Sequence, residues 1–249
     1  MQKFNFHGLI TVRTSSSRLP EKCLLPFGDS NVLVHIINRA KFYNIEPIIC
    51  TSTDSSDDVI ESIAVNESVR FFRGHLTNKL KRWSDCANYF YLSDFHTIDA
   101  DDPFFDGNEM HSSMKLLRKE KVDVITTTKT SANGAASVGY SLSTEFINKA
   151  SSLFPGDLDT EMVWNFLDQV KGLRKIRLPE TKNQKIKMRL TLDYDEDYWM
   201  LSSLNRILGK NVDRLKVEKF LQKNPDFYLI NWFRNVDYLD NQKLAKSNE

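Results

Sequence analysis

Short apolar segments alternate with segments of helical periodicity through the first part of the chain, and this order constrains the fold more than any other feature. The apolar segments, which we expect to be buried strands, cover residues 8–12, 47–50, 69–72 and 95–98. Between them, apolar residues recur at helical spacing, for example at Val32, Leu33, Ile36, Ile37 and Ala40. Repeated strand–helix units predict an α/β fold with a mostly parallel sheet, right-handed crossovers and helices on both faces.

Ligands in such sheets bind beyond the carboxyl ends of the strands, so the polar loops that follow the strands are candidate binding segments. Three of these loops should meet at one edge of the sheet: residues 13–22, 51–58 and 99–103. Residues 51–58 are rich in Ser, Thr and Asp, which also suits a turn and a helix cap. The convergence of the three loops predicts a site better than any one loop does.

Residues 13–22 combine cationic and hydroxyl side chains in a way that suits a polyphosphate. Arg13, Arg18 and Lys22 can bind phosphate oxygens, and residues 14–17 are four consecutive hydroxyl residues. The loop has neither the spacing of a P-loop nor the glycine pattern of a dinucleotide site. It therefore indicates an anion site of another kind, the alternative being a solvated connection.

Acidic residues follow the predicted strand at 95–98. Asp99, Asp101 and Asp102 would repel one another at a strand end, and a hard cation such as Mg²⁺ offsets that repulsion. The alternative is an acidic turn that caps a helix beginning near Asn108.

A second acidic cluster lies far along the chain. Residues 190–192 are expected to form a strand that leads into an acid-capped helix. Carboxylates are favoured in a first helical turn, which accounts for the acidic residues at 195–197. It does not account for Asp193, which falls at the strand end, so Asp193 is a candidate site residue.

Composition excludes several classes of protein. The 249 residues suit a single α/β domain, and the net charge of +1 provides no field for nucleic acid or an anionic membrane. The three cysteines show no C-x-x-C spacing, which fits a reducing compartment. Residues 1–7 lack an apolar signal core, and no apolar run could span a bilayer. We therefore expect a cytoplasmic protein with neither nucleic-acid nor membrane partners.

The opening loop resembles that of the cytidylyltransferases that activate acidic sugars, which include 3-deoxy-manno-octulosonate cytidylyltransferases and the SpsF-like spore coat polysaccharide group. The family pattern is R-x-x-S-T-R-L-P-x-K, and this chain has Ser17 in place of Thr and Glu21 where Gly is common. The resemblance implies that the nucleoside triphosphate is held by Arg13, Ser16, Ser17, Arg18 and Lys22.

Both acidic clusters also resemble motifs of this family. Asp101 matches the Asp of G-D-C-P or G-D-E-P, with Ala100 in place of Gly, and Asp193 matches the first Asp of R-x-T-x-D-x-x-E-D. The resemblance implies that Asp101 and Asp193 are ligands of Mg²⁺.

Two further segments are similar to the SpsF-like group. Residues 72–82 resemble F-R-G-x-x-x-x-V-L-x-R, which implies that Arg73 and Asn78 face the nucleotide or the acceptor. Lys79 and Lys81 are expected on a solvated helix face instead. Residues 224–231, which end at Asn231, resemble N-P-E-L-x-x-I-N.

The family's fold is a three-layer, Rossmann-like fold typical of nucleotide-diphospho-sugar transferases. It implies a single nucleotidyltransferase domain over residues 1–240, with an inserted arm at 128–187 that shapes the acceptor pocket and contacts a second subunit of a homodimer. Residues 241–249 are expected to be a loose tail. His111 is expected to be structural, whereas core, pocket and dimer contacts all remain open for Tyr140, Phe154, Trp164 and Phe166.

The resemblance implies an Mg²⁺-dependent enzyme that transfers CMP from CTP to a 2-keto-3-deoxy sugar acid and releases pyrophosphate. Such a product would serve the synthesis of a surface polysaccharide such as lipopolysaccharide. The catalytic groups implied are Arg13, Arg18, Lys22 and Asp101. The alternatives are a non-sugar acceptor such as a phosphonate, a base other than cytosine, a glycosyltransferase of related fold, and a non-catalytic nucleotide-binding protein.

Overall fold

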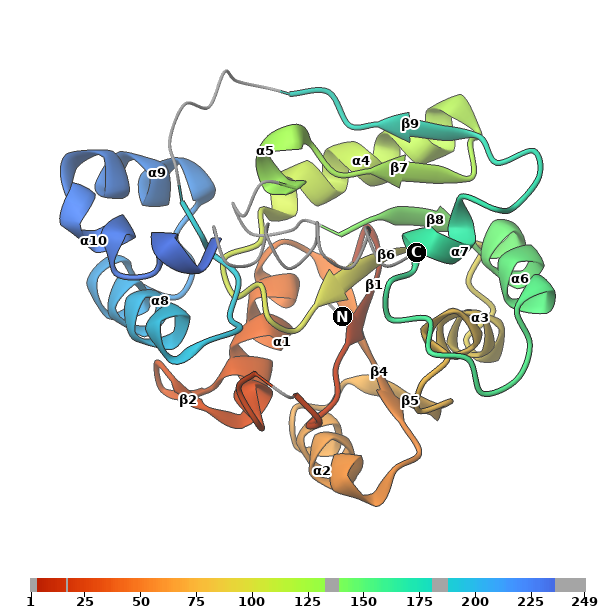
Figure 1. The fold of residues 1–249 in the computed structure, drawn as a ribbon, viewed down its shortest axis with the longest axis horizontal. Coiled ribbons are helices and arrows are strands. Elements are labelled where there is room, and N and C mark those ends of the chain that lie inside the picture. Colours follow the sequence, from red (N-terminus) through yellow and green to blue (C-terminus); the bar gives the residue numbers. More distant parts are fainter. Residues whose placement is uncertain (1–3, 17, 133–138, 181–187, 236–249) are drawn as a thin grey trace.

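The computed structural model describes residues 4–16, 18–132, 139–180 and 188–235 (Figure 1). Ser17, parts of the 128–187 arm and the expected tail at 241–249 lie outside the described residues. No helix among the described residues is long and apolar enough to cross a membrane.

A seven-stranded sheet forms the middle layer of the molecule, in the order β5-β4-β1-β6-β8-β7-β9. Its strands are β1 (Phe6–Thr11), β4 (Ile45–Ser52), β5 (Arg70–Gly74), β6 (Asp94–Asp99), β7 (Val124–Thr126), β8 (Ser141–Ser143) and β9 (Lys175–Arg177). β1 pairs in parallel with β4 and β6, β4 with β5, and β7 with β9, whereas β8 is antiparallel to both of its neighbours. The prediction of a mostly parallel sheet is confirmed.

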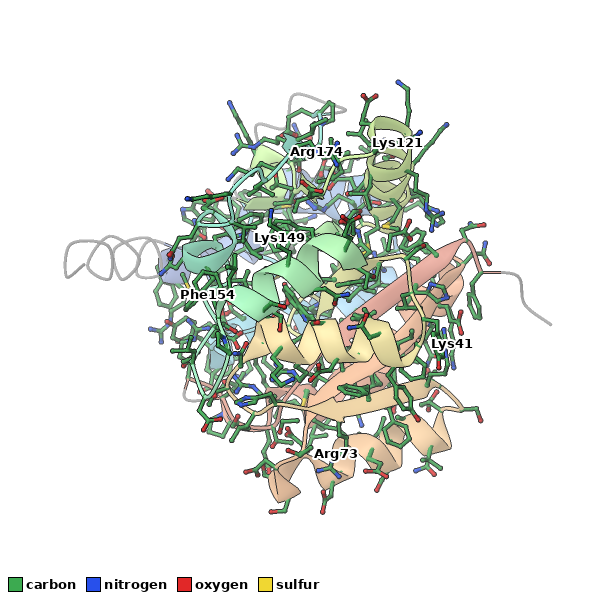
Figure 2. All side chains as sticks on the ribbon, turned by 90° about the vertical axis from the view of Figure 1, so that its right-hand side faces the viewer. Lys41, Arg73, Lys121, Lys149, Phe154 and Arg174 are labelled. Carbon is green, nitrogen blue, oxygen red and sulfur yellow. The ribbon has the colours of Figure 1, made fainter. Side chains whose placement is uncertain are left out.

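Helices cover both faces of the sheet. On the face to the left in Figure 1 lie α1 (Val32–Phe42), α8 (Asp195–Leu208), α9 (Arg214–Lys223) and α10 (Pro225–Leu229). On the other face, α3 (Lys79–Tyr89) and α6 (Thr144–Leu153) pack side by side, as Figure 2 also shows. The remaining helices are α2 (Asp58–Asn66), α4 (Gly107–Glu120), α5 (Lys129–Ala132) and α7 (Trp164–Leu167). Two short 3-10 turns, η1 (Lys22–Leu24) and η2 (Ser55–Asp57), and a small hairpin of β2 (Pro26–Phe27) and β3 (Ser30–Asn31) complete the described elements.

Two apolar cores result, one on each face of the sheet. Successive side chains of a strand point to opposite faces, so Ile10 of β1 belongs to the core that includes residues of α1 and α8, and Leu9 to the core that includes residues of α3 and α6. Both side chains are fully buried. The aromatic residues left open by the sequence belong to the second core, against which all four are packed: Tyr140, Phe154, Trp164 and Phe166.

The helix boundaries follow the sequence closely. Asn31 begins α1 by accepting a hydrogen bond from the amide of Val34 at 2.9 Å, and Asp106 caps α4 by accepting one from the amide of Asn108 at 2.9 Å. His111 is structural as expected, since its Nε2 lies 2.6 Å from the carbonyl oxygen of Tyr43.

One predicted strand is wrong. Residues 190–192 lead toward α8 as expected, but they join none of the described β-ladders. The amide of Leu192 donates instead to the carbonyl oxygen of Asp101, at 2.7 Å. The alternation of Leu190 and Leu192 therefore reflects burial, since both side chains are fully buried, rather than strand pairing.

Candidate active site

A cavity of about 320 Å³ opens at the carboxyl ends of β1 and β6. Its lining comes from the loop at 12–23, from Asp99, Ala100 and Asp101, from the first turns of α3, and from Glu161 of the arm. Two of the three predicted loops therefore meet at this edge of the sheet.

The third loop, at 51–58, supports the cavity without lining it. The carboxylate of Asp57 accepts hydrogen bonds from the amide and the hydroxyl of Thr14, at 2.8 and 2.9 Å. Asp57 is 1% exposed, so these bonds are shielded from water. This contact fixes the start of the cationic loop against β4.

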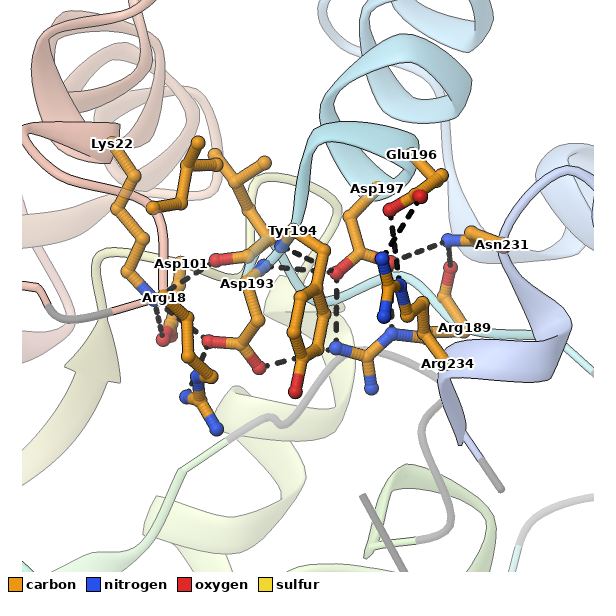
Figure 3. A network of polar contacts seen from close by, with 12 residues as sticks. Arg18, Lys22, Asp101, Arg189, Asp193, Tyr194, Glu196, Asp197, Asn231 and Arg234 are labelled. Atoms are coloured by element: carbon orange, nitrogen blue, oxygen red, sulfur yellow. Dashed lines mark hydrogen bonds and ion pairs between the residues drawn. The ribbon is translucent and has the colours of Figure 1, made fainter. Parts of the chain in front are cut away.

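The ammonium of Lys22 lies between the two acidic segments (Figure 3). Its Nζ donates to Asp101 Oδ2 at 2.7 Å and to Asp193 Oδ1 at 2.9 Å, although 171 positions separate Lys22 from Asp193. A third hydrogen bond, of 2.8 Å, reaches the carbonyl oxygen of Leu192. The fold thus brings together three residues that the sequence assigned to one site.

The pKa values of Lys22 and Asp193 are shifted by the charged groups around them. Burial alone would lower the pKa of Lys22, but Asp101 and Asp193 outweigh it and raise that pKa above its ordinary value. Burial would raise the pKa of Asp193, but Lys22 and Arg18 together lower it. Both Lys22 and Asp193 are therefore charged at neutral pH.

The two arginines of the loop reach different parts of the cavity. Arg18 donates to Asp193 Oδ1 at 2.7 Å and is half exposed. Arg13 donates to the carbonyl oxygen of Leu76 at 2.8 Å and to Glu161 at 3.1 Å. Ser16 lines the cavity beside them.

Glu21, one of the two departures from the family pattern noted above for the opening loop, has a φ of 52°. This left-handed backbone conformation favours glycine. Its side chain is exposed and does not line the cavity. The carboxylate therefore stays out of the cationic loop's binding surface.

Arg73 and Asn78 do not line the cavity. Arg73 donates to the carbonyl oxygen of Ser52 and pairs with Asp58 and Glu61, at 2.7–2.9 Å, which ties β5 to α2 (Figure 2). Asn78 is fully buried, caps α3 through the amide of Lys81, and donates to carbonyl oxygens of the arm. In this structure both side chains hold elements together, and a contact of either one with the nucleotide or the acceptor stays a prediction.

The expectation for Lys79 is wrong, because this side chain lies in the cavity rather than in solvent. We expected a solvated side chain, but Lys79 is 8% exposed and lines the cavity. Its Nζ lies 3.2 Å from Glu161, 3.7 Å from Asp99 and 5.2 Å from the centre of the Trp83 ring. The four-residue spacing from Trp83 on the buried face of α3 was the available signal.

Arg82 and Glu161 are further lining residues that the sequence did not indicate. Arg82 is 1% exposed, and its guanidinium donates to the carbonyl oxygens of His75 and Leu76. Glu161 pairs with both Arg13 and Lys79 from the distant arm. No local pattern marks Glu161, because its partners lie far away in the sequence.

Asp101 and Asp193 fit a shared divalent cation. Their carboxylates both contact the single Nζ of Lys22, so both can reach one cation, and carboxylate oxygens suit Mg²⁺. Within the described part of the chain there is no group of three or more His, Cys, Asp or Glu residues that could hold a metal by themselves. Mg²⁺ usually completes its coordination with water and substrate phosphates, so two carboxylates are sufficient.

Comparisons with known proteins find similar proteins over most of the chain. The family model for cytidylyltransferases matches residues 7–152, more than half of the chain. The spore coat polysaccharide biosynthesis protein SpsF of Bacillus subtilis is 25% identical over 88% of this chain and 94% of its own.

Solved structures show the same fold. A cytidylyltransferase from Leptospira borgpetersenii superposes with a TM-score of 0.80 at 24% identity, over 90% of this chain and 97% of that one. A CMP:2-keto-3-deoxy-manno-octonic acid synthetase in complex with CTP has a TM-score of 0.58 at 13% identity, over 80% and 98%. The predicted nucleotide-diphospho-sugar transferase-like fold is confirmed.

Proposed function

The chain belongs to the cytidylyltransferase family, and from this premise we propose that it transfers CMP from CTP to a hydroxyl of an acidic sugar, with release of pyrophosphate. The observation that carries the proposal is the placement of Lys22 between Asp101 and Asp193, with Arg18 beside them. The cationic side chains that could bind a leaving pyrophosphate therefore lie next to the carboxylates that could bind a divalent metal ion.

The cationic residues bind and stabilise the triphosphate. Arg13, Arg18 and Lys22 line the cavity, and their N–H groups can stabilise the negative charge that develops on the leaving pyrophosphate. Mg²⁺, which Asp101 and Asp193 would hold, neutralises charge on the phosphate oxygens. Positioning and electrostatic stabilisation carry most of the catalysis in transfers of this kind.

Direct attack of the acceptor on the α-phosphate fits the lining residues better than a covalent enzyme intermediate. Cys23 lines the cavity, but burial raises the pKa of its thiol to about 11, so it is protonated at neutral pH. Direct transfer is a single displacement, which inverts the configuration at phosphorus. Because no covalent nucleotidyl-enzyme forms, labelled pyrophosphate should exchange into CTP only when the acceptor is present.

An acidic acceptor is favoured by the charge of the cavity. Arg82 is a buried cation of the cavity beyond the three assigned to the triphosphate, and its guanidinium donates to the backbone carbonyl oxygens of His75 and Leu76. The neighbour solved with CTP is a synthetase for a CMP-linked 2-keto-3-deoxy sugar acid, and we propose the same acceptor class here. Since the relative SpsF is a polysaccharide biosynthesis protein, a role in surface polysaccharide synthesis, lipopolysaccharide included, is part of the proposal. The cytoplasmic location and the homodimer stay predictions.

The proposal is tested by measuring pyrophosphate release from CTP and Mg²⁺ with a panel of 2-keto sugar acids and phosphonates. Asp101→Asn and Asp193→Asn should each lower turnover by at least about 100-fold, because each removes charge that stabilises the transition state. Asp226→Asn, which changes an exposed carboxylate at the start of α10, is the control and should leave turnover unchanged. Folded Asp101 and Asp193 variants with normal turnover would contradict the mechanism. Tight CTP binding without product from any acceptor would favour a non-catalytic nucleotide-binding protein.

A further inference from the structure

Asn231 closes the 224–231 segment, which the proposed mechanism leaves without a role. It follows α10 and is fully buried. Its Nδ2 donates to the carbonyl oxygen of Arg189 at 3.0 Å and to Asp197 Oδ1 at 2.9 Å. Both acceptors lie in the segment that carries Asp193 (Figure 3).

Asp197 organises this segment from the first turn of α8. It is fully buried, and its carboxylate accepts hydrogen bonds from the guanidinium of Arg189 at 2.8 and 2.9 Å. It also accepts from the backbone amides of Asp193 and Tyr194, at 2.9 and 3.1 Å. The forked contact and the two amides fix the backbone of Asp193 relative to Arg189.

The two oxygens of the Asp193 carboxylate have different partners, and Arg189 contacts only one of them. Its Nη2 donates to Asp193 Oδ2 at 3.1 Å, from a side chain that is 1% exposed. Asp193 Oδ1, by contrast, faces Lys22 and Arg18 at 2.9 and 2.7 Å. One oxygen is held by Arg189, and the other contacts Lys22 and Arg18, two residues that line the cavity.

We propose that Asn231 is a positioning residue for the metal site: by holding Asp197 and Arg189 together, it keeps Asp193 Oδ1 directed at the position of the divalent cation. The inference rests on the proposed function, because it assumes that Asp193 binds the cation. Residues 189–231 all lie outside the region matched by the family model, and neither Asn231 nor Arg189 lines the cavity.

The other side of the Asn231 amide supports this role. Its Oδ1 is buried and has no hydrogen-bond partner among the described residues. An unsatisfied buried acceptor costs stability, which an apolar side chain of similar shape would avoid. The two hydrogen bonds of Nδ2 are therefore what the asparagine contributes.

The experiment compares Asn231→Ala and Asn231→Leu with Asn224→Ala in the full chain. Asn224 is a matched control from the same segment, exposed and bonded through its Nδ2 to the carbonyl oxygen of Phe220. Binding of Mn²⁺ in the presence of CTP is measured by electron paramagnetic resonance, and turnover is titrated with Mg²⁺. We expect the Asn231 variants to bind Mn²⁺ about 10-fold more weakly and to need correspondingly more Mg²⁺, because partners that orient metal ligands affect affinity on this scale. Asn224→Ala should match the wild type.

Two other results would overturn the inference about Asn231, and a third would refute the proposed function instead. Asn231 variants with a lowered melting temperature but wild-type Mn²⁺ affinity would overturn the inference and assign the residue to stability alone. Should both variants fail to fold, Arg189→Lys, which keeps the charge and removes the fork to Asp197, must show the same loss of Mn²⁺ affinity, and normal affinity would again overturn it. A wild-type chain that neither binds Mn²⁺ with CTP nor releases pyrophosphate would refute the proposed function instead.

Discussion

Lys22→Met removes the ammonium from between two carboxylates and should destabilise the folded protein. Lys22 lies 2.7 Å from Asp101 and 2.9 Å from Asp193, whose side chain is 6% exposed. Removing one partner of a buried ion pair costs about 3–5 kcal/mol, and we expect about 3 kcal/mol because Asp101 is partly exposed. In a chain of this size, each kcal/mol lowers the melting temperature by about 2–4 °C, so the expected decrease is about 6–12 °C.

The pH dependence of this loss follows from the signs of two pKa shifts. The pKa of Asp193 is lowered in the folded state, so its contribution to stability is present above the ordinary value of 3.8 and is lost as the pH falls below it. The pKa of Lys22 is raised, so its contribution is fully present below the ordinary value of 10.5 and is lost only at higher pH. The difference between wild type and variant should therefore be largest between these two values and should shrink in acid.

A divalent cation distinguishes this explanation from a general loss of packing. In Lys22→Met the two carboxylates lose the ammonium between them, while Arg18 and Arg189 still pair with Asp193. Mg²⁺ or Mn²⁺ should therefore raise the melting temperature of the variant more than that of the wild type. CTP binding, measured by calorimetry, should be weaker in the variant. Lys81→Met, which removes an exposed pair with Asp85, is the control and should change stability by no more than about 0.5 kcal/mol. An unchanged melting temperature in Lys22→Met, or an equal response of both proteins to the metal, would refute the reasoning.

Two further predictions use other residues. Glu161→Gln should tighten CTP binding about 2- to 5-fold in calorimetry, because it releases two cations from a carboxylate that is 48% exposed; weaker binding would show that Glu161 contacts the nucleotide. Burial lowers the pKa of His35 to about 4, so the unfolded chain binds a proton below pH 6.5 that the folded protein binds only near pH 4. The free energy of unfolding, measured in urea titrations, should therefore fall by up to about 3 kcal/mol as the pH is lowered from 6.5 to 4. If the free energy of unfolding fell equally with pH in the wild type and in His35→Gln, this assignment would be contradicted.

Periodicity was sufficient to predict the layers of the fold and the edge of the sheet that carries the cavity. Each strand–helix unit places its following loop at the same edge, so Lys22 and Asp101 could be assigned to one site without coordinates. Asp193 was singled out because helix capping accounted for its acidic neighbours but not for Asp193, and the family resemblance implied its role as a metal ligand. The strand at 190–192 was wrong because an alternating apolar pattern reports which side chains are buried, and burial does not require a β-ladder.

The residue that the sequence misplaced has partners far along the chain. Lys79 was assigned to solvent because the face of a helix that carries a charge is usually exposed, but Glu161 and Asp99 compensate its charge within the cavity. The carboxylate partners of Arg73 on α2 were likewise not foreseen. Both cases concern which acidic group meets which basic group, and spacing along the sequence carries little information about such pairs.

The pairing of charges in the cavity has a consequence for how ligands bind. In the protein alone, Lys22 pairs with Asp101 and Asp193, and Arg18 pairs with Asp193. A triphosphate that takes over Lys22 and Arg18 leaves Asp193 Oδ1 without these partners, while Arg189 still contacts Oδ2. A buried carboxylate that loses part of its compensating charge is costly. A divalent cation removes that cost, so triphosphate and metal ion should each raise the affinity of the other, and by linkage the two effects must be equal. We therefore expect the ion pairs around Lys22 to keep Asp193 charged and both carboxylates in place until nucleotide and metal ion arrive together.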